Sequence, residues 1–277
     1  MRRSIDVANA DLTESLDALQ DGYLSFCRLL GRESGVSWGE EPDISWAMTP
    51  LPFPGFNRIV RVRLDPDQAD ARIQAMSDLY QAAGVRSTWW IDDQSQPVDM
   101  GERLERMGLV SETLPAMRIE STAVPVQAWP AGVTLSWAAE PEPLRAAMHV
   151  VAAGFGMPDG FGSALGDLLA PIARPDSPAR TVVAWLDDEP VAAAQGILVG
   201  EAVAIFNVTT LEAARGRGIG AAVTLEVLRD AVRRGARFGV LESSVMGHPV
   251  YRRIGFRDVA SLRVYGTREP AAQQRAQ

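Results

Sequence analysis

The sequence of 277 residues has one cysteine, Cys27, and two histidines, His149 and His248. A single cysteine excludes an internal disulfide and a thiolate metal site, and two histidines exclude a zinc site made of imidazoles alone. His149 falls on an apolar helix, where we expect a structural residue with satisfied hydrogen bonds. His248 stands near the start of a short helix, whose dipole disfavours the imidazolium, so it is a poor candidate for a catalytic base. We expect Cys27 to be buried and to contribute to side-chain packing.

Long apolar runs and an excess of basic residues are also missing. No stretch approaches the roughly 18 uninterrupted apolar residues of a membrane-spanning helix, and no apolar run of a secretory signal follows Arg2 and Arg3. The net charge of −8 argues against a nucleic-acid surface, which depends on an excess of lysine and arginine. Apolar residues make up 47% and charged residues 22%, as in ordinary globular proteins. We therefore expect a cytoplasmic protein with no membrane or nucleic-acid partner, and the length predicts two domains.

The first half of the chain predicts a mixture of helices and short strands. Leu12, Leu16 and Leu19 recur at helical spacing in a helix over residues 11–30. Pro66 in a first turn and Gly84 just past an end mark a helix over 66–83. The other elements expected in this half are strands at 43–48, 58–64, 87–91 and 114–120 and a short helix at 99–107.

The second half predicts three consecutive antiparallel strands followed by a helix that begins at a glycine-rich loop. Strands are expected at 180–186, 191–198 and 202–210, because Asp187-Asp188 and Gly200-Glu201 between them are typical of tight turns. The remaining expected elements are a strand at 133–138, helices at 143–155, 163–173, 218–234 and 249–254, strands at 238–243 and 256–265, and a disordered tail at 269–277.

The two halves end alike. Each closes with a helix, a strand, a short helix, a glycine and a strand, with Met107-Gly108-Leu109 in the first half and Ile254-Gly255-Phe256 in the second. This repetition indicates a tandem duplication. It predicts one domain over residues 1–124 and a second over 125–268.

The strongest local signal is the loop Arg215-Gly216-Arg217-Gly218-Ile219-Gly220, which follows an apolar strand and opens a helix. Glycines allow close backbone approach to a ligand, and the unpaired amides of a first helical turn attract an anion. The two arginines add forked donors that suit phosphate oxygens. The loop therefore predicts a phosphate site, although a tight turn with solvated arginines has the same composition.

A dinucleotide site is the rival interpretation of this loop. Gly216, Gly218 and Ala221 satisfy the spacing G-x-G-x-x-A, and Glu242 ends the next strand, where a ribose-binding acid would stand. However, the loop lies late in the chain and follows consecutive strands instead of alternating strand and helix units. Residues 211–215 also separate the strand from the first glycine. These features disfavour the dinucleotide interpretation.

Two motifs resemble one known family. The pattern Arg215-x-x-Gly218-x-Gly220, entered from Val208-Thr209-Thr210, resembles the acetyl-CoA signature of the GNAT superfamily of N-acetyltransferases. Thirty residues on, the run from Leu241 to Phe256 resembles the closing motif of the same family. The resemblance covers residues 130–267, and residues 1–120 resemble more weakly the degenerate first half of tandem members. It implies an α+β fold with two GNAT-like domains in tandem, each a mostly antiparallel twisted sheet flanked by helices.

The resemblance also implies residue roles. The backbone of Val208, Thr209 and Thr210 would lie along the pantetheine arm of acetyl-CoA, and the loop from Arg215 to Gly220 would hold the pyrophosphate. Tyr251 matches the tyrosine that protonates the departing thiolate, and a phenol with a reference pKa of about 10 suits that task. Ser244 stands where many members carry an asparagine that touches the cofactor. Glu242, on the strand beside the cofactor, is a candidate general base acting through water.

These roles predict transfer of an acetyl group from acetyl-CoA, as co-substrate, to an amine by direct attack in a ternary complex. The acceptor is not identified, and a small molecule is favoured over a protein. We expect the segment 154–162, with Phe155, Met157 and Phe161, to line its pocket. The alternative is a CoA-binding sensor that has lost acyl transfer, and an oxidoreductase is a weaker third hypothesis. A monomer and a homodimer are both compatible with the sequence.

The first half lacks both functional marks. Residues 64–70 have no paired glycines, and their carboxylates would repel a pyrophosphate. Leu104 stands four residues before Gly108, where the second half has Tyr251. We therefore expect one active site per chain.

Overall fold

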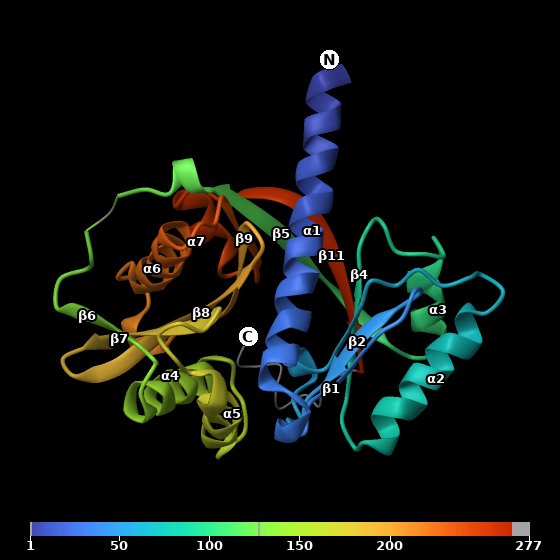
Figure 1. Cartoon of the computed structure of the whole chain (residues 1–277), viewed down its shortest axis with the longest axis horizontal. Helices are drawn as coiled ribbons and strands as arrows, with labels where there is room; N and C mark the ends of the chain where they lie inside the picture. The colour runs from blue at the N-terminus through green and yellow to red at the C-terminus, as the bar shows by residue number, and fades with distance from the viewer. Residues whose placement is uncertain (1, 127, 268–277) are drawn as a thin grey trace. The chain divides into compact units, whose positions relative to one another are not determined.

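The computed structural model describes residues 2–126 and 128–267 and divides into two compact units (Figure 1). The first unit contains the chain up to Phe26 together with residues 116–259, and the second contains 27–115 and the described residues 260–267. The units are thus interleaved and differ from the contiguous division at residue 124. The cause is that one helix and two strands each contribute residues to both units. The predicted tail at 269–277 lies outside the described residues.

The first unit is built on a sheet with the strand order β5-β10-β9-β8-β7-β6 (Figure 1). The expected antiparallel strands are confirmed, since β6 pairs with β7, β7 with β8 and β8 with β9 in antiparallel fashion. The pairing of β9 with β10 is parallel, and that of β10 with β5 is antiparallel. The strands span β5 (Val110–Glu120), β6 (Val133–Trp137), β7 (Ala179–Leu186), β8 (Glu189–Val199), β9 (Ala202–Thr210) and β10 (Phe238–Glu242).

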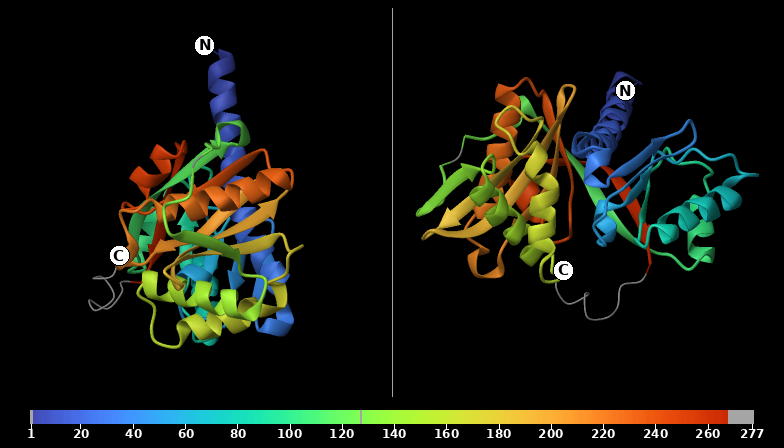
Figure 2. Two further views of the ribbon diagram at one scale, coloured as in Figure 1. Left: turned by 90° about the vertical axis from the view of Figure 1, so that its left-hand side faces the viewer. Right: turned by 60° about the horizontal axis from the view of Figure 1, so that its bottom comes forward.

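Helices cover both faces of this sheet (Figures 1 and 2). The two faces can be followed on β8, where successive side chains point in opposite directions. A Cβ on Gly196 would lie 2.4 Å from Val227 of α6, whereas the neighbouring Gln195 lines a pocket together with Leu144 of α4. The helices of this unit are α4 (Pro141–Gly154), α5 (Phe161–Leu169), α6 (Ile219–Arg233) and α7 (His248–Arg253).

The long first helix, α1 (Arg2–Leu30), belongs mostly to the first unit. Gly22 is the point of close approach, because a Cβ there would lie 2.4 Å from Cβ of Ala204 and 3.3 Å from Cε2 of Phe206, both on β9. Near the middle of this helix, Glu14 forms an ion pair with Arg118 of β5 at 2.8 Å. A helix expected to begin the first domain therefore packs on the sheet of the other half of the chain.

In the second unit, the strands of the sheet follow the order β1-β2-β3-β4-β11. Its last strand, β11, reaches this sheet from the C-terminal end of the chain, with Val264 opposite Trp90 of β4. Buried aromatic residues, Tyr80, Trp89 and Tyr265, dominate its core. Its elements are β1 (Ser37–Glu40), β2 (Ser45–Met48), β3 (Arg58–Val60), α2 (Ala69–Ala82), β4 (Thr88–Ile91), α3 (Met100–Arg106) and β11 (Arg257–Gly266).

The expected α+β fold with mostly antiparallel sheets is confirmed, and β1 is the strand that the sequence did not predict. β1 pairs with β2, and Gly39 allows the close approach, since a Cβ there would lie 2.4 Å from Nε1 of Trp46. Cys27 is fully buried, as expected. None of the helices in the described ranges has the length and apolar character that crossing a membrane requires.

Candidate functional site

The site begins where β9 and β10 separate. Their parallel pairing runs from Ala202 opposite Phe238 to Ile205 opposite Leu241, and in the described chain it extends no further. β9 nevertheless continues to Thr210 with β8 as its neighbour on the other side. Half of the backbone groups in such a strand point toward its open edge. The structure therefore places Val208, Thr209 and Thr210 on an edge that can accept an extended ligand.

A β-bulge lies at the start of this open segment. Gln195 of β8 pairs with Phe206, but Ala193 pairs with Thr209, so two residues of β9, Asn207 and Val208, stand opposite one residue of β8. Asn207 has a left-handed backbone with φ +54°. A bulge bends its strand and re-aims the peptide groups after it. The sequence contained no signal that would have located it.

The glycine-rich loop leads from β9 to α6 in the conformation that its glycines predict. Gly216 and Gly218 both have φ +78°, in the left-handed region that disfavours residues with a side chain. A Cβ on Gly216 would meet nothing within 4 Å, and one on Gly218 would meet only Pro130, at 3.9 Å. The glycines thus leave the start of the helix open from outside. Arg215 holds the turn, because its Nε donates to the carbonyl of Thr210 at 3.1 Å.

The amides at the start of α6 are uncapped. Gly218 is the N-cap and provides no side-chain hydrogen bond. In the part of the chain that the structure describes, the amides of residues 216–221 donate to no protein acceptor, and Ala222, which donates to the carbonyl of Gly218 at 3.0 Å, is the first to do so. Arg215 and Arg217 are exposed and form no ion pair with a described carboxylate. Bare amides, a helix dipole and two guanidinium groups are the features that attract an anion, so the start of α6 is a candidate anion site.

Tyr251, on α7, is a buried phenol whose hydroxyl has no hydrogen-bond partner among the described residues. Its side chain packs edge-to-face on Phe256, with ring centroids 5.8 Å apart, and the residue is 8% exposed. Gly247 makes room for the ring, because a Cβ there would lie 2.9 Å from its Cε2. Burial raises the pKa of Tyr251, so the phenol stays protonated. A buried hydroxyl without a partner is costly, which suggests that a ligand supplies one.

Ser244 and Glu242 lie between the loop and Tyr251 along the chain. The hydroxyl of Ser244 accepts a hydrogen bond from the amide of Gly247 at 3.1 Å and so helps to start α7. It keeps its own proton for donation, and contact with the cofactor stays a prediction. Glu242 is the half-buried last residue of β10, opposite Ala116 of β5.

The two histidines lie outside this centre. His248 is half-buried, with Nε2 2.7 Å from Oδ1 of Asp258, and the expectation that it is not a base stays a prediction. The expectation for His149 was wrong, because it lies on the exposed face of α4 and not among the buried residues of that helix. Apolar neighbours in the sequence do not show which way one polar residue of an amphipathic helix points. The described residues contain no group of three His, Cys, Asp or Glu that could hold a metal ion.

The segment 154–162 is anchored beside the open end of β9. A Cβ on Gly154 would lie 1.9 Å from Oγ1 of Thr209, so no larger residue fits between α4 and this strand. Phe155 is exposed and Met157 is half-buried, and contact of either with an acceptor stays a prediction. Phe161 is only 6% exposed and packs inward at the start of α5. The expected apolar surface is therefore reduced to Phe155 and Met157.

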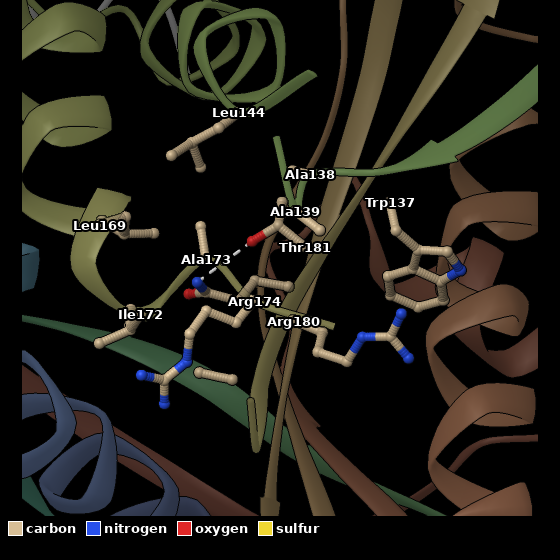
Figure 3. Close-up of a pocket in the computed structure, with 12 residues that line it drawn as sticks. Trp137, Ala138, Ala139, Leu144, Leu169, Ile172, Ala173, Arg174, Arg180 and Thr181 are labelled. Atoms are coloured by element: carbon tan, nitrogen blue, oxygen red, sulfur yellow. Dashed lines mark hydrogen bonds between the residues drawn. The ribbon is translucent and has the colours of Figure 1, made fainter. Parts of the chain in front are cut away.

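A pocket on the α4 and α5 side of the sheet contains none of the residues that the sequence singled out (Figure 3). Leu144, Leu169 and Ile172 form much of its wall, with Trp137 and Arg180 at one side. Arg180 is engaged by Asp230 at 2.6 Å and lies over the ring of Trp137 at 4.1 Å. The buried Gln195, which also borders the pocket, is the residue in it that connects to β9.

Comparisons with known proteins agree with the geometry. Residues 128–241 match the family model described as an acetyltransferase (GNAT) domain, which ends before Ser244 and Tyr251. No curated protein matches the sequence. A GCN5-related N-acetyltransferase from Kribbella flavida is similar in structure, with a TM-score of 0.67 and 18% identity, over 90% of this chain and 96% of the other.

Two further solved structures have the same fold. One is a GCN5-related N-acetyltransferase from Sphaerobacter thermophilus, with a TM-score of 0.61 and 19% identity over 81% of this chain and 80% of the other. The other is a tandem GNAT protein from the clavulanic acid biosynthesis pathway, with a TM-score of 0.53 and 13% identity over 82% and 79%. Residues 128–241 thus match the model of a GNAT acetyltransferase domain, and the chain is similar in fold to these three solved structures.

Proposed function

We propose that this protein transfers an acetyl group from acetyl-CoA to the amine of a small molecule, in a ternary complex. The observation that carries the proposal is the start of α6, where the uncapped amides of residues 216–221 stand beside two exposed arginines. A pyrophosphate supplies the charge and the acceptor oxygens that such a site needs. The family-model match supports acyl transfer as the chemistry, and the identity of the acyl group is part of the proposal.

The reaction would proceed by direct attack. The acceptor nitrogen forms a bond to the thioester carbonyl carbon, and amides on the open edge of β9, at Val208 to Thr210, stabilise the oxyanion. The carbon–sulfur bond then breaks, and Tyr251 donates its proton to the thiolate. The attacking nitrogen loses its proton to water or, through water, to Glu242. The raised pKa of Tyr251 keeps the donor protonated throughout the neutral range.

A CoA-binding sensor without acyl transfer is the second candidate. One observation favours it: Ser244 occupies the position of an asparagine that touches the cofactor in many members, and its hydroxyl already accepts from Gly247. A sensor would bind CoA through the same loop and need no acid.

Two measurements test the proposal. Calorimetry with acetyl-CoA, CoA and NADP should show binding of the first two, with one molecule per chain. A panel of small amines, amino acids and peptides, assayed for free thiol released from acetyl-CoA, should then reveal an acceptor. The chain contains no lysine, so any acetyl-lysine detected in the assay belongs to the acceptor. Tight CoA binding without turnover of any amine would favour the sensor, and binding of NADP alone would overturn both.

A further inference from the structure

Asn207 lies inside strand β9 of the first unit and has a left-handed backbone, although it is not a glycine. The other described non-glycine residues with positive φ are Asp187 and Asp188, in the turn between β7 and β8, and Arg61, after β3. A turn explains the first two. Asn207 instead lies inside β9, at the bulge where this strand leaves β10. Some contact must stabilise this conformation against the extended one.

A chain of side-chain hydrogen bonds, one partly buried and one buried, supplies that contact. Nδ2 of Asn207 donates to Oε1 of Gln195 at 3.1 Å, and Nε2 of Gln195 donates to Oγ1 of Thr181 at 3.3 Å. The second of these bonds is drawn in Figure 3 beside Thr181. Gln195 is 2% exposed and Thr181 is 6% exposed. The side chains of three neighbouring strands, β9, β8 and β7, are thus joined in a line.

Gln195 is fixed at both ends of its amide. It lies opposite Thr181 in the register of β7 and opposite Phe206 in that of β9, so its backbone is also held on both sides. A buried primary amide is costly unless its oxygen and nitrogen are both bonded, and here each has a partner. The side chain cannot rotate without breaking one of these bonds. It therefore acts as a rigid bracket for Asn207.

We propose that Gln195 is a positioning residue for acyl transfer. By holding Asn207 at φ +54°, it sets the bulge that aims the amides of residues 208–210 at the open edge of β9. Without this bracket, Asn207 relaxes toward negative φ, and the peptide groups after it turn away from the thioester. The inference depends on the proposed function, since it assigns those amides to the oxyanion. It also explains why an amide stands among the apolar residues of β8.

The test combines a substitution at Gln195 with one at Asn207. It asks whether turnover depends on the backbone conformation of Asn207 or on the amide side chains themselves. Gln195→Met keeps the size of the side chain and removes both hydrogen bonds, so turnover should fall by about ten- to a hundred-fold. Affinity for CoA should stay within about twofold, because the loop at 215–220 is untouched. Adding Asn207→Gly should restore most of the lost turnover, because glycine adopts positive φ without a bracket. Asn207→Ala, which like Asn207→Gly lacks the side-chain amide but which resists positive φ, should not restore turnover.

A matched control removes a polar pair elsewhere in the same sheet. Ser136→Ala breaks the bond from Trp185 Nε1 to Ser136 Oγ, 2.6 Å long, between β6 and β7, and should leave turnover unchanged. If the double variant Gln195→Met, Asn207→Gly is no faster than Gln195→Met alone, the positioning role is overturned. The same holds if Gln195→Met is as active as the native protein.

A second readout does not depend on turnover. The amide resonances of Val208 and Thr209 should shift in Gln195→Met and return toward their native positions when Asn207→Gly is added. If the native protein transfers no acyl group but these shifts occur, the proposed function fails while the bracket stands. If turnover is present and the resonances do not move, the bracket fails while the proposed function stands.

Discussion

The two units contain helices that begin in opposite ways. α6, in the first unit, starts at two left-handed glycines with bare amides and two exposed arginines. Before α2, in the second unit, Asp65 accepts from the two residues that lead into the helix, its Oδ1 from the amide of Asp67 at 2.9 Å and its carbonyl from that of Gln68 at 3.0 Å. Asp70 adds a further carboxylate in the first turn. Neither helix has a side-chain cap, so the difference is one of charge: carboxylates beside α2 repel an anion, and guanidinium groups beside α6 attract one.

The closing segments of the two units, around Gly108 and Gly255, have the same backbone conformation but different side chains. Gly108 and Gly255 both follow a short helix and have φ of +82° and +105°. In each case a later amide reaches back by the same bond, from Leu109 to the carbonyl of Leu104 at 3.2 Å and from Phe256 to that of Tyr251 at 3.0 Å. This shared geometry agrees with the predicted duplication. The difference is the side chain at the corresponding position: Tyr251 of the first unit carries a phenol, and Leu104 of the second has no hydroxyl.

Reversing the charge of the loop before α6 should have the largest effect, because it makes the start of α6 resemble the start of α2. The double substitution Arg217→Glu, Gly218→Asp should weaken CoA binding by several kcal/mol, about a thousand-fold or more, because carboxylates repel the pyrophosphate and a side chain blocks the amides. Titration calorimetry measures this directly. CoA affinity within tenfold of the native value would show that the pyrophosphate does not bind there.

The second unit offers a matched control for this variant. Gly84 also has positive φ, +71°, and a Cβ on it would meet nothing within 4 Å. Arg86→Glu with Gly84→Asp therefore imposes the same charge change and a comparable backbone strain beyond the end of α2. It should leave CoA affinity unchanged and cost a similar amount of thermal stability.

Removing the hydroxyl of Tyr251, which Leu104 of the second unit also lacks, is the next largest change. Tyr251→Phe should lower turnover by about a hundred-fold, because the thiolate then leaves unprotonated, while CoA affinity stays the same. Burial raises the pKa of Tyr251 above its ordinary value near 10, so the native protein should show no loss of turnover from phenol ionisation up to about pH 10. Kinetics between pH 6 and 10 check both statements. A fully active Phe variant would remove Tyr251 from the mechanism.

The sequence predicted most elements of the first unit closely, because glycines, turn residues and apolar periodicity act locally. α6 was expected at 218–234 and spans Ile219–Arg233, since Gly218 and Gly235 mark its ends. The loop could be found for the same reason. The glycines and arginines that characterise it all lie within six consecutive residues, so a short stretch of sequence is enough to identify it.

Features that depend on distant contacts could not be predicted. The interleaving of the units arises from the packing of Gly22 on Ala204 and Phe206, which are about 180 residues away along the chain. The bulge at Asn207 depends on Gln195 of another strand. Single polar residues on apolar strands have no local signature, so the bracket was not visible from the sequence. β1 was missed for a different reason: its partner β2 is near in the sequence, but its four residues, Ser37 to Glu40, are mostly polar and include a glycine.

The smallest effect compares the buried tyrosines of the two units. Tyr80, in the second unit, is 2% exposed and donates to the carbonyls of Ala47 at 2.9 Å and Arg58 at 3.2 Å. Tyr80→Phe should therefore lower the free energy of unfolding by about 1–2 kcal/mol. Tyr251→Phe removes a hydroxyl without a described protein partner, so it should change that free energy by less than about 0.5 kcal/mol or raise it. Urea unfolding at pH 7 measures both.

High pH sharpens this comparison. Burial raises the pKa of both phenols, with the charge on Cys27 adding to the effect at Tyr80. Above about pH 10 the phenols ionise in the unfolded chain but not in the folded one. The free energy of unfolding should therefore be intact below pH 10 and fall as pH rises above it, by up to about 1.4 kcal/mol per pH unit for each buried phenol. In each Tyr→Phe variant, the free energy of unfolding should fall less steeply with pH, by the contribution of the phenol that was removed. If Tyr251→Phe destabilised the protein as much as Tyr80→Phe at pH 7, its hydroxyl would serve the fold, and the case for a phenol reserved for a ligand would fail.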